Sequence, residues 1–410
     1  MENNIRNISF YFFVFSLFFF GGIGVGIVSI RNICAAILFI YSLYNLNRIK
    51  LDRCQKLYLI YLGFLLLSNI FNGQLIDYNF IQNLIAYHFV SIVLFMAIPL
   101  FFNSLLDVKK AILFLMLVYV FNACVSIFQF FNNPLGWSIG FMISPGASSL
   151  FDGQLAYLKD SENFMSRSIV FGITGFVVAN GYFLASFLPI ATHKILFKNE
   201  SVKDNILSML ILLLACITIF MVQQRMAFGL LLFYILLVIY LRTNLLSRIF
   251  VLLIIIFTIC LYHIPTNLDA GRLTEGITTD DRMNQLSHFI DFLNSDSFIW
   301  GADLYDMHLL YTMGHNTLMD ALRRGGFITF LIYIILFINL FFKCIKTSFN
   351  AYKSEFKYTF IFSICCLIFL LYSFTHATGI QSGAVYFWLL YSLMLVSNNY
   401  ENEKNIMFNR

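Results

Sequence analysis

Arg225 is the residue whose position in this sequence is hardest to explain by structure alone. It stands in the five-residue segment QQRMA, residues 223–227, between two apolar blocks. An unpaired cation at membrane depth is costly, so a charged residue there is by default a functional candidate. The alternative is an arginine at a helix end that extends its head group into the water. We favour the functional interpretation of Arg225.

The histidines are the other candidates for acid–base or metal chemistry. Six of the seven lie in predicted outside loops or at the outer ends of predicted spans, namely His88, His263, His288, His308, His315 and His376. We interpret most of them as an interfacial polar belt. Asp303, Asp306 and His308 resemble a metal cluster, but carboxylates near a histidine are common in polar loops. We predict no metal site and no cofactor, and the eight cysteines contain no CxxC pair.

These residues must be positioned by apolar segments, each about long enough to cross a bilayer as a helix. Of the 410 residues, 60% are hydrophobic and 11% are charged, with a mean hydropathy of +0.81, whereas soluble domains are about 25% charged. We therefore predict an all-α fold, a polytopic transmembrane helical bundle with about 12 spans in a single integral membrane domain, 1–410. The predicted spans are 8–22, 27–46, 57–71, 84–102, 111–131, 168–190, 206–222, 226–241, 248–263, 327–342, 358–374 and 383–397.

Lysine and arginine predict the orientation of these spans. With the N-terminus inside, 18 of the 26 basic residues fall on the inside. The outside residues are Arg31, Lys159, Arg167, Arg225, Arg272, Arg282, Arg323 and Arg324. This asymmetry predicts that both termini are cytoplasmic. The net charge of +5 does not indicate nucleic acid, because the basic residues separate apolar segments instead of forming a soluble patch.

Two predicted outside connections, 132–167 and 264–326, are much longer than the roughly 2–8 residues usual between bundled helices, and long connections are often functional. The second carries an amphipathic pattern, in which apolar residues share one helix face: Met283, Leu286, Phe289, Ile290 and Leu293. We expect short amphipathic helices there, forming an ordered lid on the membrane surface.

Acidic residues are missing from two places where particular mechanisms need them. The predicted spans contain no aspartate or glutamate, which disfavours a proton-coupled transporter or flippase. The first outside loop, 21–32, also lacks them, which disfavours a glycosyltransferase that holds a metal in that loop.

Four features follow one another in an order typical of one family. They are RSIVFGITGFVVANGYFLA from Arg167, Gln224-Arg225-Met226-Ala227 at the start of a span, Arg282 before an amphipathic segment ending at Trp300-Gly301, and HNTLMDALRRGGFIT from His315. The sequence resembles the O-antigen polymerase and O-antigen ligase superfamily. The pattern His315-Asn316, nine residues, Gly326, two residues, Thr329 is the most specific part. The resemblance implies a fold like that of GT-C type membrane glycosyltransferases, with a large periplasmic loop.

The resemblance also implies roles for individual residues. Arg225 and Arg282 would donate hydrogen bonds to a pyrophosphate, with Arg167 as a weaker third. His315 would take the acceptor proton or bind phosphate, and Asn316 would bind substrate. His315-Asn316 can also be explained as a helix N-cap opening the tenth span. Arg323 and Arg324, eight and nine residues after His315, would face either substrate or lipid head groups.

The expected function is that of a metal-independent surface-polysaccharide polymerase in the bacterial inner membrane, with its active site facing the periplasm. Its substrates would be undecaprenyl-pyrophosphate-linked oligosaccharides, and a chain-length regulator protein would be a partner. One alternative is the ligase that attaches glycan to lipid A-core. Another, of a different class, is a polysaccharide flippase or other transporter.

Overall fold

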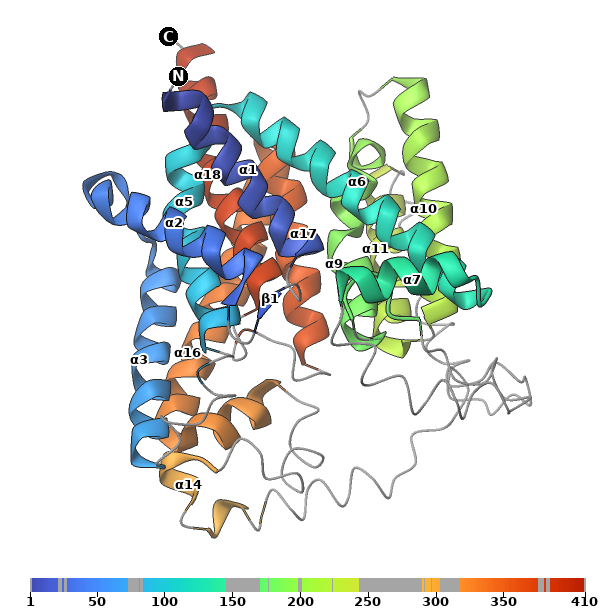
Figure 1. Ribbon diagram of the computed structural model, residues 1–410. Coiled ribbons are helices and arrows are strands. Elements are labelled where there is room, and N and C mark those ends of the chain that lie inside the picture. The colour runs from blue at the N-terminus through green and yellow to red at the C-terminus, as the bar shows by residue number, and fades with distance from the viewer. Residues whose placement is uncertain are drawn as a thin grey trace. The chain divides into compact units, whose positions relative to one another are not determined.

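The computed structural model describes residues 2–20, 24–25, 28–72, 81, 84–144, 170–175, 177–197, 201–222, 224–242, 290, 292–295, 297–302, 317–374, 380 and 384–408. These residues are mainly helical, and the chain divides into two compact units (Figure 1). Unit 1 comprises Met1–Lys109 and Thr278–Arg410, and unit 2 comprises Lys110–Ile277.

Unit 1 is built around helices from both ends of the chain. Its elements are α1 (Glu2–Phe19), the antiparallel pair β1 (Gly24–Val25) and β2 (Val28–Ser29), α2 (Ile30–Tyr44), the 3-10 helix η1 (Leu46–Arg48), α3 (Arg53–Phe71), the π-helix η3 (Leu84–Phe89), α5 (Val90–Phe101), α14 (Ser297–Trp300), α16 (Thr317–Lys353), α17 (Lys357–Ser373) and α18 (Val385–Phe408). Helix α16 packs against α3 and α17, and α18 packs against α17 and α5 (Figure 1). Residues 359–366 of α17 are all buried. Because eight consecutive residues cover every face of a helix, α17 lies in the core of unit 1.

Unit 2 contains the remaining helices. They are most of α6 (Leu105–Phe130), α7 (Pro134–Ile143), α9 (Val177–Ala191), the 3-10 helix η5 (His193–Leu196), α10 (Val202–Val222) and α11 (Arg225–Arg242). Helix α9 packs against α10 and α11. Residues 180–192 of this unit are buried without a gap, so α9 is its most enclosed helix among those described.

Asp52 joins three helices at one end of unit 1. Its Oδ1 accepts a hydrogen bond from the Gln55 N–H at 2.8 Å, and the Gln55 side chain accepts one from the Asp52 N–H, which completes a capping box at the start of α3. Its Oδ2 pairs with Lys343 of α16 and accepts a hydrogen bond from the Tyr391 hydroxyl of α18 at 2.6 Å. One carboxylate therefore fixes the relative positions of α3, α16 and α18.

Six of the described helices are long and apolar enough to cross a membrane. They are Arg53–Phe71, Leu84–Phe101, Leu105–Phe130, Val202–Val222, Arg225–Arg242 and Thr317–Lys353. Shorter apolar helices of 10–17 residues lie between them in the sequence. These lengths and compositions confirm the prediction of a helical membrane protein. The count of about twelve spans stays a prediction, and the predicted span 248–263 lies outside the described residues.

The helices differ from the predicted segments at three places. The tenth predicted span was expected at 327, but α16 begins at Thr317, so its first residues are helical and not part of a loop. Residues 170–175 are not helical, and α9 begins only at Val177. Helix α7 lies inside the predicted long connection 132–167 and begins with Pro134, which is well suited to a first helical position.

Candidate functional site

Helix α16 is interrupted at the glycine of the most specific sequence motif. Gly326 has a φ of 68° and a ψ of −173°, a conformation essentially restricted to glycine. A side chain there would overlap the carbonyl group of Ile299, which lies against the break. Gly301 has a φ of 88°, and a Cβ on it would lie 2.8 Å from the Arg323 carbonyl oxygen. The Ala302 N–H donates a hydrogen bond to that oxygen at 2.8 Å. The motif ending at Trp300-Gly301 and the glycine motif of α16 are therefore in contact.

The end of α3 holds the same segment from the other side. Asn72 donates hydrogen bonds from Nδ2 to the carbonyl oxygens of Trp300, at 2.7 Å, and Gly301, at 3.1 Å. The Ser68 hydroxyl also donates to the Trp300 carbonyl. The rings of Phe71 and Trp300 have centroids 4.2 Å apart. These contacts join α3, α14 and the break in α16 into one assembly.

A charged cluster, defined as Asp320, Arg323 and Arg324, occupies the first two turns of α16. Oδ1 of Asp320 accepts hydrogen bonds from Nε and Nη2 of Arg323 at 3.2 and 2.8 Å, and Oδ2 accepts one from Nε of Arg324 at 2.6 Å. Spacings of three and four residues place the three side chains on one helix face. The side chains of Asp320, Arg323 and Arg324 are 0%, 1% and 21% exposed. The formal charges of these three side chains sum to +1, so the cluster favours a nearby anion.

The burial of Arg323 tests the alternative, left open by the sequence, that this residue faces lipid head groups. A residue that extends to lipid head groups keeps its charged end in water, whereas Arg323 is fully buried. That interpretation of Arg323 is wrong. Asp320 also lies on a long helix, although the predicted spans contained no acid. Because both its oxygens accept hydrogen bonds from arginines, it differs from the isolated carboxylate of a proton relay.

Tyrosines and a histidine continue this polar interior of unit 1. The hydroxyls of Thr317 and Tyr333 are 2.7 Å apart, and the rings of Tyr61 and Tyr333 have centroids 5.5 Å apart. The Tyr58 hydroxyl lies 2.8 Å from Nδ1 of His88. Tyr61 and His88 are both within electrostatic range of the charged cluster. All five residues are buried, so this interior is protected from bulk water.

Arg31 is a second cation of unit 1, and the sequence analysis did not select it. It lies in the first turn of α2, with its guanidinium carbon 5.6 Å from the centroid of the Tyr87 ring and within electrostatic range of Tyr386. Its Nε is buried without a hydrogen-bond partner, and no carboxylate pairs with it among the described residues. Tyr87 precedes His88 on η3, so Arg31 and the charged cluster approach the same short π-helix. Such π-helices are rare in proteins, and those that occur are often at functional sites.

Arg225 belongs to unit 2. Helix α10 ends at Val222 and α11 begins with Arg225, which confirms the short turn that the sequence predicted. Gln224 is buried beside it, and Arg225 itself is partly buried. The N-terminus of a helix carries a partial positive charge. A cation at this position is therefore favourable mainly when an anion lies close to it.

A neutral network of four buried amide and hydroxyl side chains lies inside unit 2: Asn122, Ser126 and Gln129 of α6, and Asn180 of α9. Nδ2 of Asn122 donates to Oδ1 of Asn180 at 2.8 Å. Nδ2 of Asn180 donates to the Ser126 hydroxyl at 3.0 Å and to the Val170 carbonyl at 3.2 Å. Asn180, which lies in the first segment of the family resemblance, is thus bound to α6 and to the chain that precedes its own helix.

The neutral network satisfies the backbone of the non-helical residues 170–175. Oε1 of Gln129 accepts hydrogen bonds from the N–H groups of Phe171, at 3.1 Å, and Gly172, at 2.8 Å. Oδ1 of Asn122 accepts one from the Ile173 N–H at 2.8 Å. Irregular backbone at membrane depth requires such internal partners. Residues 170–175 are therefore held in place by side chains of α6.

The remaining predicted site residues, Arg167, Arg282, His315 and Asn316, lie outside the described residues, as do Asp303, Asp306 and His308. Helix α16 begins directly after His315-Asn316, which places the charged cluster within two turns of that motif. The prediction that Arg225, Arg282 and His315 share one cavity stays a prediction. No family model matches this chain, and no curated protein matches it.

Proposed function

We propose that this protein is a membrane glycosyltransferase that polymerises a surface polysaccharide. It transfers glycan from an undecaprenyl-pyrophosphate-linked donor to a sugar hydroxyl of another lipid-linked repeat unit. The observation that carries this proposal is the charged cluster, in which two arginines share one buried carboxylate directly after His315-Asn316. The charged cluster thus carries a formal charge of +1 close in sequence to the motif expected to do the chemistry.

The reaction needs cations and one base. The acceptor hydroxyl oxygen bonds to the anomeric carbon, the bond from that carbon to the pyrophosphate oxygen breaks, and the hydroxyl proton passes to a base. The departing pyrophosphate is an anion, which arginine binds with charged and often bidentate hydrogen bonds. A histidine with a pKa near neutrality is the usual base. His315 has this role, or it binds phosphate.

Five arginines are assigned to the pyrophosphate in this proposal. The family resemblance supplies Arg225, Arg282 and, more weakly, Arg167. The structure adds support for Arg324, the most exposed member of the charged cluster, and for Arg31, whose Nε lacks a hydrogen-bond partner. Arg323 pairs with Asp320 and so positions Arg324, and its own contact with substrate stays a prediction. Asn316 binds the sugar.

The proposed topology places this chemistry at the outer face of the bacterial inner membrane, with both termini in the cytoplasm. The bias of lysine and arginine toward the opposite side supports this orientation. A polysaccharide transporter is the alternative of a different class, but the pairing of Asp320 with two arginines does not favour a proton relay on α16. The ligase of the same superfamily is the other alternative.

A deletion strain separates these functions by the lipopolysaccharide that it makes. Loss of a polymerase leaves lipid A-core capped with a single repeat unit and no ladder, because ligation of unextended units continues. Loss of a ligase leaves bare core with long glycan on the lipid carrier. Loss of a transporter leaves bare core with single units on the carrier. Either bare-core result contradicts the proposal, and an unchanged ladder points to another exported glycan.

Complementation of this strain tests the assigned residues. His315→Ala should reduce polymer yield by about 10²–10⁴, the usual effect of removing a general base. Arg282→Lys and Arg324→Lys should lose most activity, because an ammonium group cannot replace the bidentate guanidinium. Arg53→Lys changes an exposed arginine at the start of α3 and is the matched control. Full polymer yield from Arg324→Lys at equal membrane expression would show that the charged cluster is not part of the active site.

A further inference from the structure

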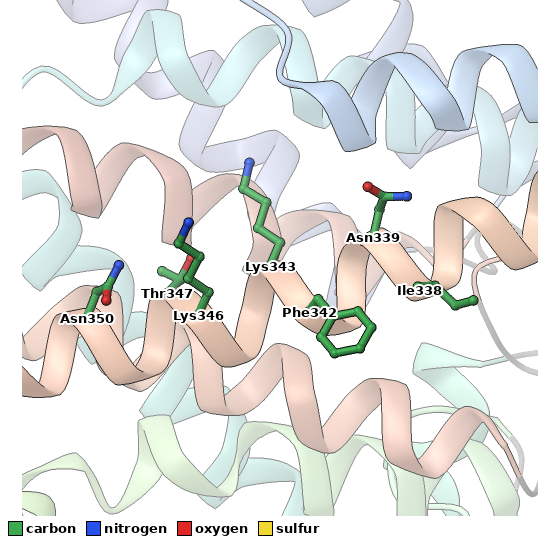
Figure 2. Close-up of a pocket in the computed structure, with 7 residues that line it drawn as sticks. All are labelled: Ile338, Asn339, Phe342, Lys343, Lys346, Thr347 and Asn350. Atoms are coloured by element: carbon green, nitrogen blue, oxygen red, sulfur yellow. The ribbon is translucent and has the colours of Figure 1, made fainter.

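An open groove runs along one face of α16, well beyond the charged cluster and the helix break. Its volume is about 470 Å³. The side chains that line it are Ile338, Asn339, Phe342, Lys343, Lys346, Thr347 and Asn350 (Figure 2). They recur at intervals of three and four residues, so they form one continuous stripe along the helix.

The polarity of this groove changes along the helix. Ile338 and Phe342, 47% and 64% exposed, provide an apolar surface at one end, where the Asn339 amide donates a hydrogen bond to the Ile335 carbonyl of the same helix at 2.7 Å. Lys346, Thr347 and Asn350 provide an ammonium group, a hydroxyl and an amide at the other (Figure 2). At a rise of 1.5 Å per residue, the stripe is about 18 Å long. This length accommodates a polar head group, a glycerol backbone and the first part of an acyl chain.

The two lysines of the groove differ in what they contact. Lys343 pairs with Asp52 and lies 5.6 Å from the centroid of the Tyr391 ring, so its charge is largely used inside unit 1. Lys346 is exposed, and among the described residues it has no ion pair or hydrogen bond. Its ammonium group therefore gives the polar end of the groove a net positive charge.

We infer that this groove binds one anionic phospholipid, with the phosphate at Lys346, Thr347 and Asn350 and an acyl chain along Phe342 and Ile338. A charged end continuous with an apolar end matches such a lipid, whereas a free anion would leave the apolar half unused. Basic residues near a membrane surface attract anionic lipids, by about 1 kcal/mol for each lysine. In the proposed topology this end of α16 faces the cytoplasm. The inference uses none of the residues assigned to glycan transfer, so either can fail alone.

Native mass spectrometry of the purified full-length protein tests this lipid site. The protein is titrated with phosphatidylglycerol and with phosphatidylcholine of the same acyl chains. We expect one phosphatidylglycerol to bind more tightly than phosphatidylcholine. Lys346→Gln should weaken phosphatidylglycerol binding about fivefold, the equivalent of one lost lysine contact, and leave phosphatidylcholine binding unchanged. Lys110→Gln alters an exposed lysine of α6 that does not line the groove and should change neither.

Three results would overturn the inference. Equal binding of both lipids by the unaltered protein excludes charge recognition, and equal losses in Lys346→Gln and Lys110→Gln exclude the groove. Competition by glycerol phosphate at the same concentration as the lipid shows a phosphate site without an acyl chain. An Asn350→Cys variant provides a further check in native membranes. If it forms disulfide-linked dimers that the unaltered protein does not form, the groove is an interface between two copies of the chain.

Discussion

Each unit of this protein contains irregular backbone at a glycine with positive φ, but the polar side chains close to the two glycines in space or in sequence differ in charge. In unit 2, Gly172, with a φ of 58°, is surrounded by the amides and hydroxyl of the neutral network. In unit 1, Gly326, with a φ of 68°, lies directly after the charged cluster. One glycine is thus surrounded by neutral side chains, and the other follows a cluster of charged side chains on its own helix.

The difference in charge suggests a structural role for the neutral network of unit 2 and a functional role for the charged cluster of unit 1. Amides that exchange hydrogen bonds among themselves and with backbone groups need no further partner, so the neutral network is complete within unit 2. An ion cluster inside a membrane protein is costly and is seldom kept for stability alone, because apolar residues would stabilise as well or better. We therefore expect changes in the neutral network to affect folding first. Changes at Arg324 should affect transfer first.

The largest expected effect comes from removing the shared carboxylate. Asp320→Ala leaves Arg323 buried and two guanidinium groups side by side. Breaking a buried ion pair in this way typically costs about 3–5 kcal/mol. We expect little folded protein in membranes and a strongly lowered melting temperature in detergent.

Asp204→Ala is the control for this prediction. Asp204 pairs with Lys194 at 3.8 Å on the surface, with the two side chains 44% and 33% exposed. Exposed pairs contribute about 0–1 kcal/mol, so this variant should melt close to the unaltered protein. If both variants melt alike, the charged cluster does not stabilise unit 1.

An intermediate effect is expected at the glycine of the neutral network. Gly172→Ala forces a side chain into the left-handed region, which costs about 1–3 kcal/mol. The new methyl group would also lie 2.7 Å from Oδ1 of Asn180. Gly229→Ala is the matched control, since nothing lies within 4 Å of its Cβ position on α11. Thermal melting should show a loss for the first variant only, and equal melting temperatures would contradict the observed backbone.

The sequence was sufficient to predict most of the helices, but not the irregular segments beside them or the side chains that hold those segments. Apolar segments of bilayer length are helical over most of their described residues, with 170–175 as the main exception, because hydrophobicity and length are local properties. The neutral network was not predicted, since Asn122, Ser126 and Gln129 are separate polar residues in an apolar segment. Their common role is visible only in their hydrogen bonds with Asn180 and with the chain before it. Those hydrogen bonds depend on tertiary structure.

The charged cluster was partly visible in the sequence. Arg323 and Arg324 were selected, but Asp320 was not, because the predicted span began at 327 and left Asp320 in the long connection 264–326. The chain is instead helical from Thr317 up to the break at Gly326, and this places Asp320 three and four residues before the two arginines. Arg31 was visible only as a basic residue on the unexpected side. Its unpartnered Nε follows from packing, which the sequence does not contain.

The smallest effect should come from a matched pair of tyrosines. Tyr333 of unit 1 shares a buried hydrogen bond with Thr317 at 2.7 Å, and Tyr234 of unit 2 shares one with Thr192 at 2.6 Å. Removing either hydroxyl with a Tyr→Phe change should cost about 0.5–1.5 kcal/mol, the net contribution of a typical hydrogen bond. The two melting temperatures should therefore fall by similar amounts.

The rate of glycan transfer should differ between the two variants. Thr317 opens the helix that carries the charged cluster, whereas Tyr234 belongs to the unit whose polar interior is neutral. We expect Tyr333→Phe alone to lower polymer yield at matched membrane expression. Equal yields from both variants would show that the interior of unit 1 is no closer to the chemistry than that of unit 2.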